Sequence, residues 1–440
     1  MAGIFKAYDI RGIYDVDLTD DIAYNIGRAF VSFVGCKRVV VARDIRPHSE
    51  PLFASLAKGI TEQGADVIDI GHASTPMSYF ANGTLGADAS VMITASHNPA
   101  EWNGFKLCRA KATPISGATG IMDIERIIQE GSFAPKADTP GTISQMDVTA
   151  EYARHVARTA RLTQPVHVAI DFANGMGIWE AKALEGLLTW DGLYDDPDGT
   201  FPNHEANPLN LETLHDIQAK VRNGNYAFGV AFDGDADRAG FVDEKGEIIS
   251  MDLITALIAQ DVLAERKGVV FYDLRSSWAV KEVIAAAGGT PMMSRVGHAF
   301  IKQQMREHDA LFAGELSGHY YFRDNFTSES SAMAVLAIAN IVSKSGQPLS
   351  ALIEPLRKYF ASGEINSHVE RDPKTILDEI RRTYTDGHQF ELDGVSVEYA
   401  DWWFNVRCSN TEALIRLNLE ATTQELMEAK RDELLALIRR

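Results

Sequence analysis

Three aspartates spaced two residues apart follow an apolar run near the middle of the chain. The run covers 228–232, and Asp233, Asp235 and Asp237 come directly after it, with Arg238 next. Carboxylates at alternate positions of a looped backbone can converge on one hard divalent cation. A calcium-binding EF-hand loop is the competing interpretation, but Arg238 stands where such a loop needs glycine. We therefore predict a divalent-cation site here, with Arg238 placed for a phosphate that bridges to the same ion.

A serine ends a second apolar run. The segment 91–99 reads Val-Met-Ile-Thr-Ala-Ser-His-Asn-Pro, so Ser96 falls in a short turn after a predicted strand. A serine hydroxyl becomes a useful nucleophile only with a base or a metal ion beside it. The G-x-S-x-G elbow of α/β-hydrolases is missing from this segment. Taken alone, the turn fits a structural cap before Pro99 better than a catalytic site.

A third segment combines groups that suit a sugar. Glu315, Ser317 and His319 alternate, so an extended backbone would place the three side chains on one face. A carboxylate and a hydroxyl can bind neighbouring sugar hydroxyls, while a histidine can move a proton or bind phosphate. His298 lies upstream as a further candidate. A polar loop with no ligand is the alternative.

Two more segments supply groups for an anion. After the apolar run 402–406, a short loop offers several donors to one anion: Arg407, Ser409, Asn410 and Thr411. Near the N-terminus, Arg11 follows Tyr8, and Lys106 lies downstream of Ser96; both cations are candidates for charge near a reacting phosphate. Singly, these segments are equally typical of polar turns and surface cations.

The composition limits the partners. The 440 residues include 42 Lys and Arg against 61 Asp and Glu, which gives a net charge of −19. Such a chain repels nucleic acid and anionic membranes over most of its surface. Its three cysteines form no C-x-x-C pair, and we see neither a signal peptide nor an apolar run long enough to span a bilayer. We expect a cytoplasmic protein without nucleic-acid or membrane partners; the sequence does not indicate the oligomeric state.

The elements that must position these groups follow an α/β pattern. Three short apolar runs each end in an aspartate before a polar loop and a helical stretch: 39–43 before Asp44, 166–170 before Asp171 and 269–272 before Asp273. This repetition favours three related α/β domains with mixed sheets, although strand–Asp–loop segments are common in α/β proteins. After 359 the pattern changes to that of a small α+β domain. We predict four domains: 1–145, 146–249, 250–358 and 359–440.

Within that pattern several individual elements are predicted. Helices are expected at 148–159, 251–265, 331–342, 373–384 and 423–439, a hairpin around 393–394 and a strand at 402–407.

Together the five motifs resemble those of the α-D-phosphohexomutase family, in the same order. They are Tyr8-Asp9-Ile10-Arg11-Gly12, Thr94-Ala95-Ser96-His97-Asn98-Pro99, Asp233-Gly234-Asp235-Ala236-Asp237-Arg238, Gly314-Glu315-Leu316-Ser317-Gly318-His319 and Arg407-Cys408-Ser409-Asn410-Thr411-Glu412. The resemblance spans nearly the whole chain. It implies four domains around a central cleft.

The resemblance also implies an activity. Members move a phosphoryl group between the 1 and 6 positions of a hexose through a phosphoserine, with Mg²⁺ and a hexose 1,6-bisphosphate intermediate. By position in the motifs, the resemblance implies catalytic roles for Ser96, Arg11, Lys106 and His319. It implies metal ligation by Ser96, Asp233, Asp235 and Asp237, with Arg238 beside them. It implies substrate contacts from Tyr8, His298, Glu315, Ser317, Arg407, Ser409, Asn410 and Thr411. The sequence does not identify the general base.

The sugar-binding motif also bears on which hexose is bound. The sugar-binding motif is similar to that of enzymes with dual phosphomannomutase/phosphoglucomutase activity, with Leu316 where these have Met. Ala413 replaces a common Pro, and 327–331 departs from the usual Asp-Gly pattern without a functional account. We expect mannose or glucose phosphates, or both, as substrates. The alternatives are a phosphoglucosamine mutase, a hydrolase that releases the phosphate to water, and a non-catalytic sugar-phosphate- or metal-binding protein.

Overall fold

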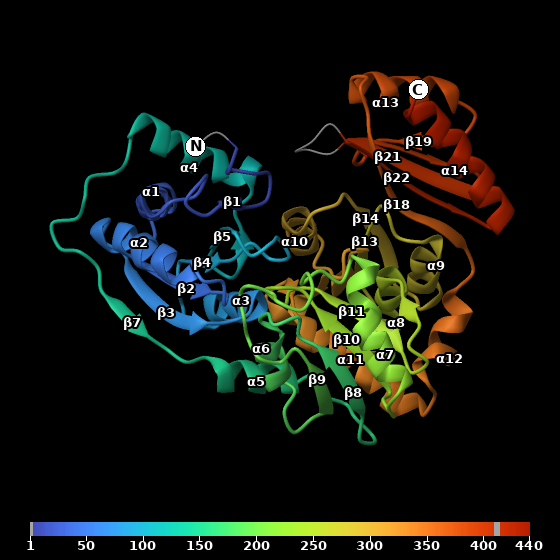
Figure 1. Ribbon diagram of the computed structural model, residues 1–440, viewed down its shortest axis with the longest axis horizontal. Helices are drawn as coiled ribbons and strands as arrows, with labels where there is room; N and C mark the ends of the chain where they lie inside the picture. The colour runs from blue at the N-terminus through green and yellow to red at the C-terminus, as the bar shows by residue number, and fades with distance from the viewer. Residues whose placement is uncertain (1–2, 409–413) are drawn as a thin grey trace.

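Four β-sheets follow one another along the chain, and each carries its own helices (Figure 1). The computed structural model describes residues 3–408 and 414–440. The first three sheets mix parallel and antiparallel pairs, whereas the described strand pairs of the fourth are antiparallel. We call each sheet with its helices a domain, numbered I to IV. The architecture confirms the predicted fold class of three α/β units followed by an α+β unit.

Domain I contains the first sheet, in the order β1-β5-β4-β2-β3-β7 with β6 paired to β5. Its strands are β1 (Ile10–Ile13), β2 (Arg38–Arg43), β3 (Asp66–His72), β4 (Ala89–Ile93), β5 (Trp102–Arg109), β6 (Thr113–Pro114) and β7 (Ile143–Gln145). Its helices are α1 (Asp20–Val34), α2 (Ser49–Glu62), α3 (Thr75–Thr84) and α4 (Ile121–Glu130), with the 3-10 turn η1 (Gly117–Thr119).

Domain II contains the second sheet, in the order β12-β11-β10-β8-β9. Its strands are β8 (His167–Asp171), β9 (Thr189–Leu193), β10 (Phe228–Phe232), β11 (Ala239–Asp243) and β12 (Ile248–Ile249). Its helices are α5 (Thr149–Ala157), α6 (Gly177–Lys182) and α7 (His215–Arg222), with the 3-10 turn η2 (Leu211–Leu214).

Domain III contains the third sheet, in the order β14-β13-β15-β16-β17. Its strands are β13 (Val269–Asp273), β14 (Thr290–Ser294), β15 (Phe312–Gly314), β16 (Tyr320–Phe322) and β17 (Ser328–Glu329). Its helices are α8 (Met251–Glu265), α9 (Trp278–Ala286), α10 (His298–Glu307), α11 (Ser331–Ser345) and α12 (Leu349–Ile353), with the 3-10 turns η3 (Arg323–Asn325) and η4 (Glu354–Leu356).

Domain IV contains the fourth sheet, in the order β18-β22-β21-β20-β19. Its strands are β18 (Phe360–His368), β19 (His388–Phe390), β20 (Val395–Glu398), β21 (Trp402–Cys408) and β22 (Leu414–Ala421), and its helices are α13 (Pro373–Thr383) and α14 (Gln424–Ile438). The predicted helices begin and end within two residues of α5, α8, α13 and α14, and the predicted helix at 331–342 continues to Ser345 in α11.

One strand arrangement recurs in domains I, II and III. In each, a central strand has a parallel neighbour on both sides, and one of these neighbours pairs on its far side with an antiparallel strand. The central strands are β2, β8 and β13, which are the three runs that end in aspartate. The loops that leave their neighbours β4, β10 and β15 toward the antiparallel strands therefore occupy equivalent positions. These three loops carry Ser96, the three aspartates and the predicted sugar-binding motif.

The recurring aspartate has the same structural role in each domain. The Oδ1 atoms of Asp44, Asp171 and Asp273 each accept a hydrogen bond from the backbone N–H two residues later, at 3.1, 2.9 and 2.8 Å. An aspartate commonly ends a strand in this way because its short side chain can turn back to its own backbone. The same local bond in all three domains supports their relation.

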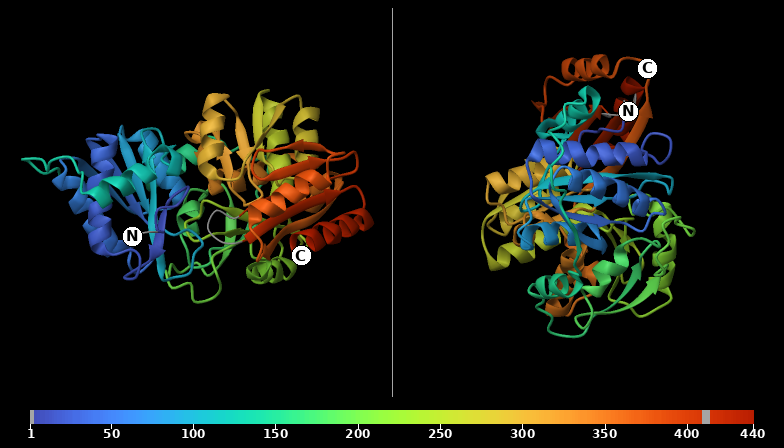
Figure 2. Two further views of the ribbon diagram at one scale, coloured as in Figure 1. Left: turned by 90° about the horizontal axis from the view of Figure 1, so that it is seen from above. Right: turned by 90° about the vertical axis from the view of Figure 1, so that its left-hand side faces the viewer.

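Domains I, II and III share an apolar core, whereas domain IV has a separate one. Buried side chains of domain I, such as Val40 and Phe80, belong to the same cluster as Val230 of domain II and Val270 of domain III. The core of domain IV is enclosed between its sheet and the helices α13 and α14. Domains I and IV lie toward opposite ends of the long axis (Figures 1 and 2). Domain IV is thus the part of the molecule least tied to the rest by apolar packing.

Glu180 connects the first three domains through polar contacts. Its carboxylate is fully buried and accepts hydrogen bonds from Ser74 Oγ of domain I at 2.5 Å, from Tyr152 OH at 2.9 Å and from the backbone N–H of Ala332 in α11 at 2.9 Å. Burial raises the pKa of Glu180 to about 7, although the three donors act to lower it. A carboxylate in this position fixes how three domains meet.

We predict that Glu180→Ala destabilises the protein, because three buried donors lose their acceptor. The expected loss in the free energy of unfolding is about 3 kcal/mol, seen as a lower Tm, with the exposed Glu185→Ala as the matched control. The folded state holds the Glu180 proton more tightly than the unfolded state. The free energy of unfolding of the wild type therefore falls as the pH rises from the usual pKa of 4.5 to the folded value of about 7. The Tm difference between variant and wild type should therefore be larger at pH 5 than at pH 8, and equal Tm values would contradict this.

Candidate active site

The three equivalent loops of domains I, II and III meet at one point. Ser96 Oγ donates to Asp233 Oδ2 at 2.9 Å, which joins the loop after β4 to the loop after β10. His319 Nε2 lies 3.2 Å from Asp237 Oδ1, which joins the loop after β15 to the same aspartates. These side chains are buried, except for small exposed fractions of Ser96, Asp237 and His319. The sequence-predicted serine, metal-binding and sugar-binding motifs thus lie side by side.

Arg46 fixes the loop after β4 that carries Ser96, which we call the serine loop. Its guanidinium is buried and donates to four backbone carbonyls of the loop: Ser96 at 2.8 Å, Asn98 and Pro99 at 2.6 Å each, and Trp102 at 2.9 Å. Arg46 is itself fixed by Asp44, the aspartate that ends β2. Arg46 was not among the predicted site residues, although its position two residues after a strand-ending aspartate was a usable signal.

Arg11 holds the same loop from the other side. Its guanidinium donates to Asn98 Oδ1 at 2.6 Å and to the carbonyl of Ala95 at 3.2 Å, and it pairs with Asp9 at 2.7 Å. His97 Nδ1 also reaches Ser96 Oγ, at 3.2 Å, a contact that adjacency in sequence alone did not require. Burial and the nearby arginines Arg238 and Arg11 lower the pKa of His97 well below its usual value. The ring beside the serine hydroxyl is therefore neutral.

The backbones of the serine loop and the metal loop touch. A Cβ atom on Gly234 would lie 2.3 Å from the carbonyl oxygen of Ser96, closer than any side chain allows. Glycine at this position is what lets the aspartate loop approach the serine. Ser96 itself has a φ of 53°, in the left-handed region that L-residues seldom adopt.

The aspartates form a dense negative cluster that is only partly neutralised. Lys106 Nζ lies 2.6 Å from Asp235 and 2.5 Å from Asp237, and Thr75 Oγ1 donates to Asp235 at 2.6 Å. Burial and the two neighbouring carboxylates raise the pKa of Asp233, because each added negative charge makes its ionisation harder. Burial also acts to raise the pKa of Asp237, but the charges of Lys106 and His319 lower it well below its usual value.

The donor set fits a hard divalent cation. The three aspartates can each offer one oxygen within 4.8 Å of the others. Asp235 Oδ1 is buried without a hydrogen bond from the described residues, and Asp237 Oδ1 has only the ion-pair contact with His319 at 3.2 Å. Buried carboxylate oxygens without a donor are costly unless a cation neutralises them. The acidic cluster could therefore bind a metal ion.

The sugar-binding motif is a tight turn and not the extended segment that the sequence suggested. Residues 315–319 close the hairpin between β15 and β16, with the Glu315 N–H bonded to the His319 carbonyl at 3.0 Å. The turn itself brings the side chains together: Ser317 Oγ lies 2.9 Å and Glu315 Oε2 3.1 Å from His319 Nδ1. Burial acts to lower the pKa of His319, but Asp237 and Glu315 raise it to about 9.

The stretch 327–331 supplies an unexpected carboxylate. Glu329 is fully buried and pairs with Lys302 at 2.6 Å, and its Oε1 lies 3.8 Å from Nδ1 of His298. Tyr8 closes the same side from domain I, where its hydroxyl donates to the Val296 carbonyl at 3.2 Å. The rings of Tyr8 and His298 lie with their centroids 6.0 Å apart, and the N–H of Gly297, next to His298, donates to Glu315 of the sugar turn at 3.0 Å.

Three arginines lie where domains III and IV meet, and we call them the arginine cluster: Arg275 from the loop after β13 in domain III, and Arg407 from β21 and Arg416 from β22 in domain IV. All three guanidiniums surround Glu364 of β18; Arg407 pairs with it directly, and Arg275 and Arg416 lie 3.6 Å away. Arg275 also pairs with Asp273 at 2.6 Å, and Asp273 accepts from the N–H of Leu316 in the sugar turn at 2.9 Å. Arg407 was predicted as an anion contact, whereas Arg275 and Glu364 were not among the predicted site residues.

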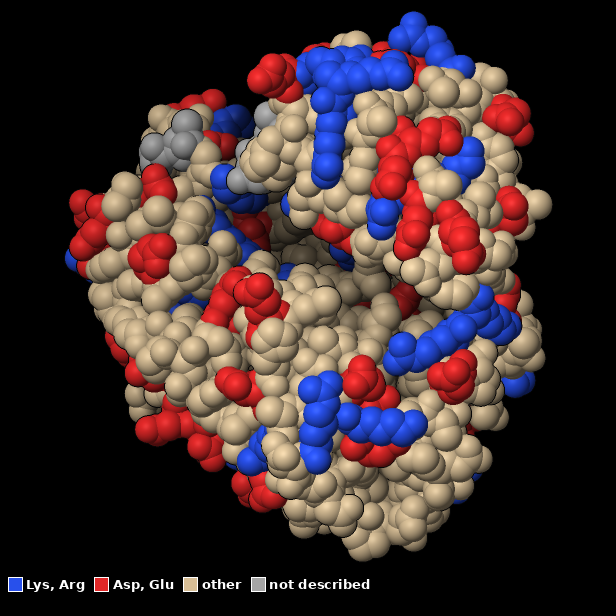
Figure 3. Space-filling model, turned by 45° about the vertical axis from the view of Figure 1, so that its right-hand side comes forward, with Lys and Arg blue, Asp and Glu red and all other residues tan. Residues whose placement is uncertain are grey.

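The predicted site residues fall into one continuous arrangement. It runs from Ser96 through the aspartates and the sugar turn to the arginine cluster. Arg238 lies beside the aspartates, with its Nε 3.3 Å from His319 Nε2. Figure 3 shows a deep hollow near the middle of one face, with charged side chains of both signs inside it. Ser409, Asn410 and Thr411, also predicted as phosphate contacts, lie outside the described residues.

Comparison with known proteins identifies the family. Domain models of the phosphoglucomutase/phosphomannomutase family match the chain in four consecutive parts: α/β/α domain I at 2–135, domain II at 150–246, domain III at 250–359 and the C-terminal domain at 364–437. The chain belongs to this family. It is therefore a phosphohexomutase, an enzyme that transfers phosphate intramolecularly. The matches do not favour a phosphoglucosamine mutase or a non-catalytic binding protein.

Full-length relatives agree with this assignment. The phosphohexomutase is 40% identical over 449 residues to a phosphomannomutase of Salmonella montevideo, which covers 99% of this chain and 98% of the relative. It is 39% identical over 446 residues to a phosphomannomutase of Methanocaldococcus jannaschii, with 99% and 97% covered. A crystal structure of a phosphoglucomutase/phosphomannomutase family protein from Burkholderia thailandensis superimposes with a TM-score of 0.91 at 33% identity, over 99% of this chain and 96% of that one.

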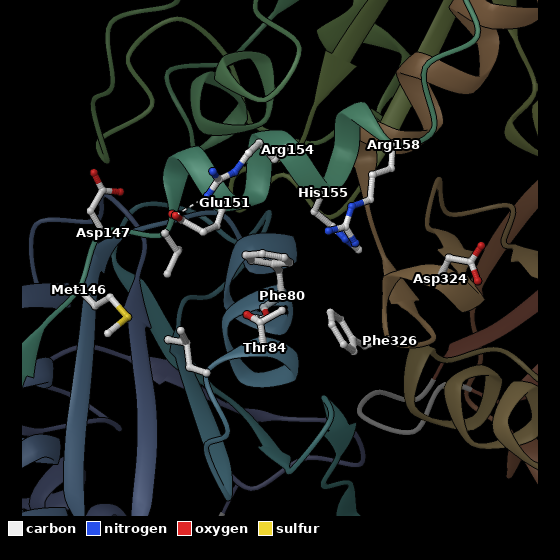
Figure 4. A pocket seen from close by; sticks show the side chains of 12 residues that line it. Phe80, Thr84, Met146, Asp147, Glu151, Arg154, His155, Arg158, Asp324 and Phe326 are labelled. Atoms are coloured by element: carbon white, nitrogen blue, oxygen red, sulfur yellow. Dashed lines mark hydrogen bonds and ion pairs between the residues drawn. The ribbon is translucent and has the colours of Figure 1, made fainter.

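A separate cavity of about 1030 Å³ lies between α3, α5 and the segment after η3 (Figure 4). Phe80 and Phe326 face it, and Arg154 of α5 and Arg158, the residue directly after α5, also line it. Its described lining contains neither the serine, the aspartates nor the arginine cluster. The cavity is therefore distinct from the active site of the phosphohexomutase.

Among the described residues, no helix has the length and apolar character needed to cross a membrane.

Proposed function

We propose that this phosphohexomutase interconverts the 1-phosphate and 6-phosphate of mannose, of glucose or of both. The observation that carries the proposal is the order of groups along the site. A serine with three buried aspartates lies at one end, a turn rich in sugar-binding groups in the middle and an arginine cluster at the other end. That order matches a sugar with phosphate chemistry at one end and a second phosphate held at the other.

In the first half-reaction, Ser96 carries the phosphoryl group. The bond between phosphorus and Ser96 Oγ breaks, and a new bond forms to the free 6-hydroxyl of a bound hexose 1-phosphate. We assign the proton of that hydroxyl to His319, which lies in the sugar turn next to the aspartates. Because Asp237 and Glu315 raise the pKa of His319 to about 9, its ring must first release its own proton to solvent before it accepts this one. Arg11 and Lys106 place positive charge beside the transferring group, because phosphoryl transfer depends mostly on positioning and charge stabilisation. Ser96 Oγ takes up a proton as it leaves, so the products are free Ser96 and the hexose 1,6-bisphosphate.

In the second half-reaction, the bisphosphate has turned end for end. Its 1-phosphoryl group passes to Ser96 Oγ: the bond between phosphorus and O1 breaks, Ser96 Oγ gives up its proton as the new bond forms, and O1 takes up the proton carried by His319. The products are the hexose 6-phosphate and phosphorylated Ser96. Throughout, we propose that Glu315 and Ser317 hold two sugar hydroxyls, with Tyr8 and His298 lining the same side. Arg407, Ser409, Asn410 and Thr411 hold the phosphate that does not react. A remote contact of this kind fixes the reacting oxygen relative to the serine.

We propose Mg²⁺ as the metal, held by Asp233, Asp235 and Asp237 together with an oxygen on Ser96. When bound, Mg²⁺ neutralises negative charge that develops on the phosphoryl oxygens. Carboxylate ligands and a phosphate oxygen are the set that this ion usually takes. Arg238, next to these ligands, adds a guanidinium that can bind the same phosphoryl group.

We also propose domain boundaries at 1–145, 146–249, 250–358 and 359–440. The sheets of domains I to IV lie within these ranges.

We propose that the protein is cytoplasmic and that hexose phosphates are its partners. Cys36, Cys108 and Cys408 are free thiols, which supports a reducing setting such as the cytoplasm.

Ser96→Ala should lower mutase turnover by several orders of magnitude and leave the fold intact, because the phosphoryl acceptor is lost. Intact-mass analysis should find a phosphoryl group on the wild-type protein after incubation with hexose 1,6-bisphosphate, but not on the variant. Ser345→Ala, at the end of α11, serves as the control with normal turnover. Near-normal activity of Ser96→Ala would remove this serine from the mechanism.

Removing divalent metal should abolish turnover, and Mg²⁺ should restore it. Ca²⁺ is expected to bind and support little turnover, because it accepts a looser arrangement of ligands. Asp235→Asn should need more Mg²⁺ for half-maximal activity, while the exposed Asp324→Asn should behave like wild type. Full activity after exhaustive chelation and dialysis would argue against the metal site.

The sugar is decided by direct competition. Mannose 1-phosphate, glucose 1-phosphate and glucosamine 1-phosphate are assayed side by side with glucose 1,6-bisphosphate present. We expect kcat/KM for mannose or glucose phosphate to exceed that for the amino sugar at least about tenfold, which corresponds to about 1.4 kcal/mol in the transition state. A preference for glucosamine 1-phosphate would overturn the proposed specificity.

A further inference from the structure

A single carboxylate, that of Glu364, lies within ion-pair distance of all three guanidiniums of the arginine cluster. Arg407 Nη2 pairs with its Oε2, Arg275 Nη1 lies 3.6 Å from the same oxygen, and Arg416 Nη1 lies 3.6 Å from Oε1. Arg407 is nearly buried, with 4% of its side chain exposed, while Glu364 keeps 24% exposed. A carboxylate here takes the same guanidinium donors that a phosphate group would take, because both anions bind that planar fork of N–H groups.

The sheet of domain IV places this carboxylate on its polar face. Glu364 is paired with Asn418, and Arg416 with Arg407, so these side chains extend from one side of the sheet. Asn418 Oδ1 also accepts from Arg407 Nη1 at 3.2 Å. Side chains at intervening positions, such as Leu417, belong to the apolar core on the other side. Glu364 therefore lies among the arginines as a regular member of this face.

A local irregularity in β18 sets the position of Glu364. The pairing of β18 with β22 shifts between Ala361 and Glu364, and Gly363 in this bulge has a φ of 67°. Ser362 Oγ accepts from the N–H of Leu419 at 3.1 Å and so replaces a backbone bond. A one-residue change of register would turn Glu364 to the opposite face. The bulge thus keeps the carboxylate directed at the arginines.

The charges show what this carboxylate does to an incoming phosphate. Asp273 already neutralises Arg275, and Glu364 neutralises Arg407. Among these ion-paired side chains, two carboxylates already face three guanidiniums. Burial acts to raise the pKa of Glu364, but the three arginines lower it, so the carboxylate is ionised near neutral pH. A phosphate entering the cluster must displace Glu364 from Arg407 or bind beside its negative charge, and either route weakens binding.

Weak binding has a use in the proposed reaction, on which this inference rests. The bisphosphate intermediate must leave the arginine cluster with one phosphate and return with the other in every turnover. An interaction that holds ground state and intermediate equally tightly adds nothing to the chemical step and slows this exchange. We propose that Glu364 is a built-in competitor for the phosphate. Its carboxylate occupies the arginine cluster when no phosphate is bound, and it weakens the binding of the non-reacting phosphate so that the bisphosphate can turn round.

Glu364→Gln tests the proposal, because the amide keeps an acceptor for Arg407 and removes the negative charge. The affinity for inorganic phosphate, measured by titration calorimetry on the full-length protein, should rise about tenfold, the effect of one charge-assisted contact. In the mutase assay, KM for the hexose 1-phosphate should fall by a similar factor. At the same time kcat should fall and less bisphosphate should be released, because exchange of the intermediate becomes slower.

A double-mutant cycle tests whether the effect of Glu364→Gln arises in the arginine cluster. The gain in phosphate affinity should disappear when Glu364→Gln is made in an Arg407→Gln background, since the competition is for that guanidinium. Glu370→Gln removes the same charge from an exposed position two residues after the end of β18. This control variant should leave phosphate affinity, KM and kcat unchanged. Equal Tm values of Glu364→Gln and wild type would exclude misfolding as the cause.

The opposite outcome identifies a purely structural role. If Glu364 only holds the arginines in place, Glu364→Gln weakens phosphate binding and raises KM at constant kcat, and the proposal is wrong. An unchanged affinity for phosphate also overturns it. The calorimetric measurement requires no turnover, so it decides the role of Glu364 even if the mutase assay were to contradict the proposed function.

Discussion

The structure depends on placing three carboxylates at one buried point. Asp233, Asp235 and Asp237 lie at the end of β10, where water cannot screen their mutual repulsion. Buried charges persist only with close partners of opposite sign, because desolvation of each ion costs several kcal/mol. The partners come from elsewhere in the chain: Lys106 from β5 of domain I, and His319 from the sugar turn of domain III. Charge compensation thus requires the three domains to meet in one arrangement, and the same arrangement brings Ser96 to the aspartates.

The local sequence pattern was sufficient for the elements and for much of the site. Apolar runs ending in an aspartate are a short-range signal, and β2, β8 and β13 lie where those runs were found. The aspartate cluster and the sugar-binding motif were visible for the same reason, since their residues are neighbours in sequence. The exception was 315–319, where the alternation of Glu315, Ser317 and His319 indicated that an extended backbone would bring the three side chains together. Gly318, with a φ of 84°, instead allows the backbone to turn and close a hairpin.

Residues that act across long sequence separations could not be predicted in this way. Arg46 binds carbonyl groups about fifty positions away, and Glu180 receives donors from three domains. Neither has a neighbour in sequence that reveals its partner. Glu364 is harder still, because its role depends on a bulge that sets which face of β18 it occupies. A shift of one residue in that register leaves the composition of the strand unchanged and removes the contact.

Ser96 holds a backbone conformation that its residue type disfavours. Its φ of 53° costs an L-residue about 1 kcal/mol, a cost that glycine does not incur. The four carbonyl bonds from Arg46 and the close approach of Gly234 keep the loop in this shape. The residue that performs the chemistry is therefore not the residue that the fold prefers. During evolution, selection for turnover has to retain serine here although glycine would adopt this backbone conformation at a lower free-energy cost. A lineage released from that selection would gain stability by replacing its nucleophile with glycine.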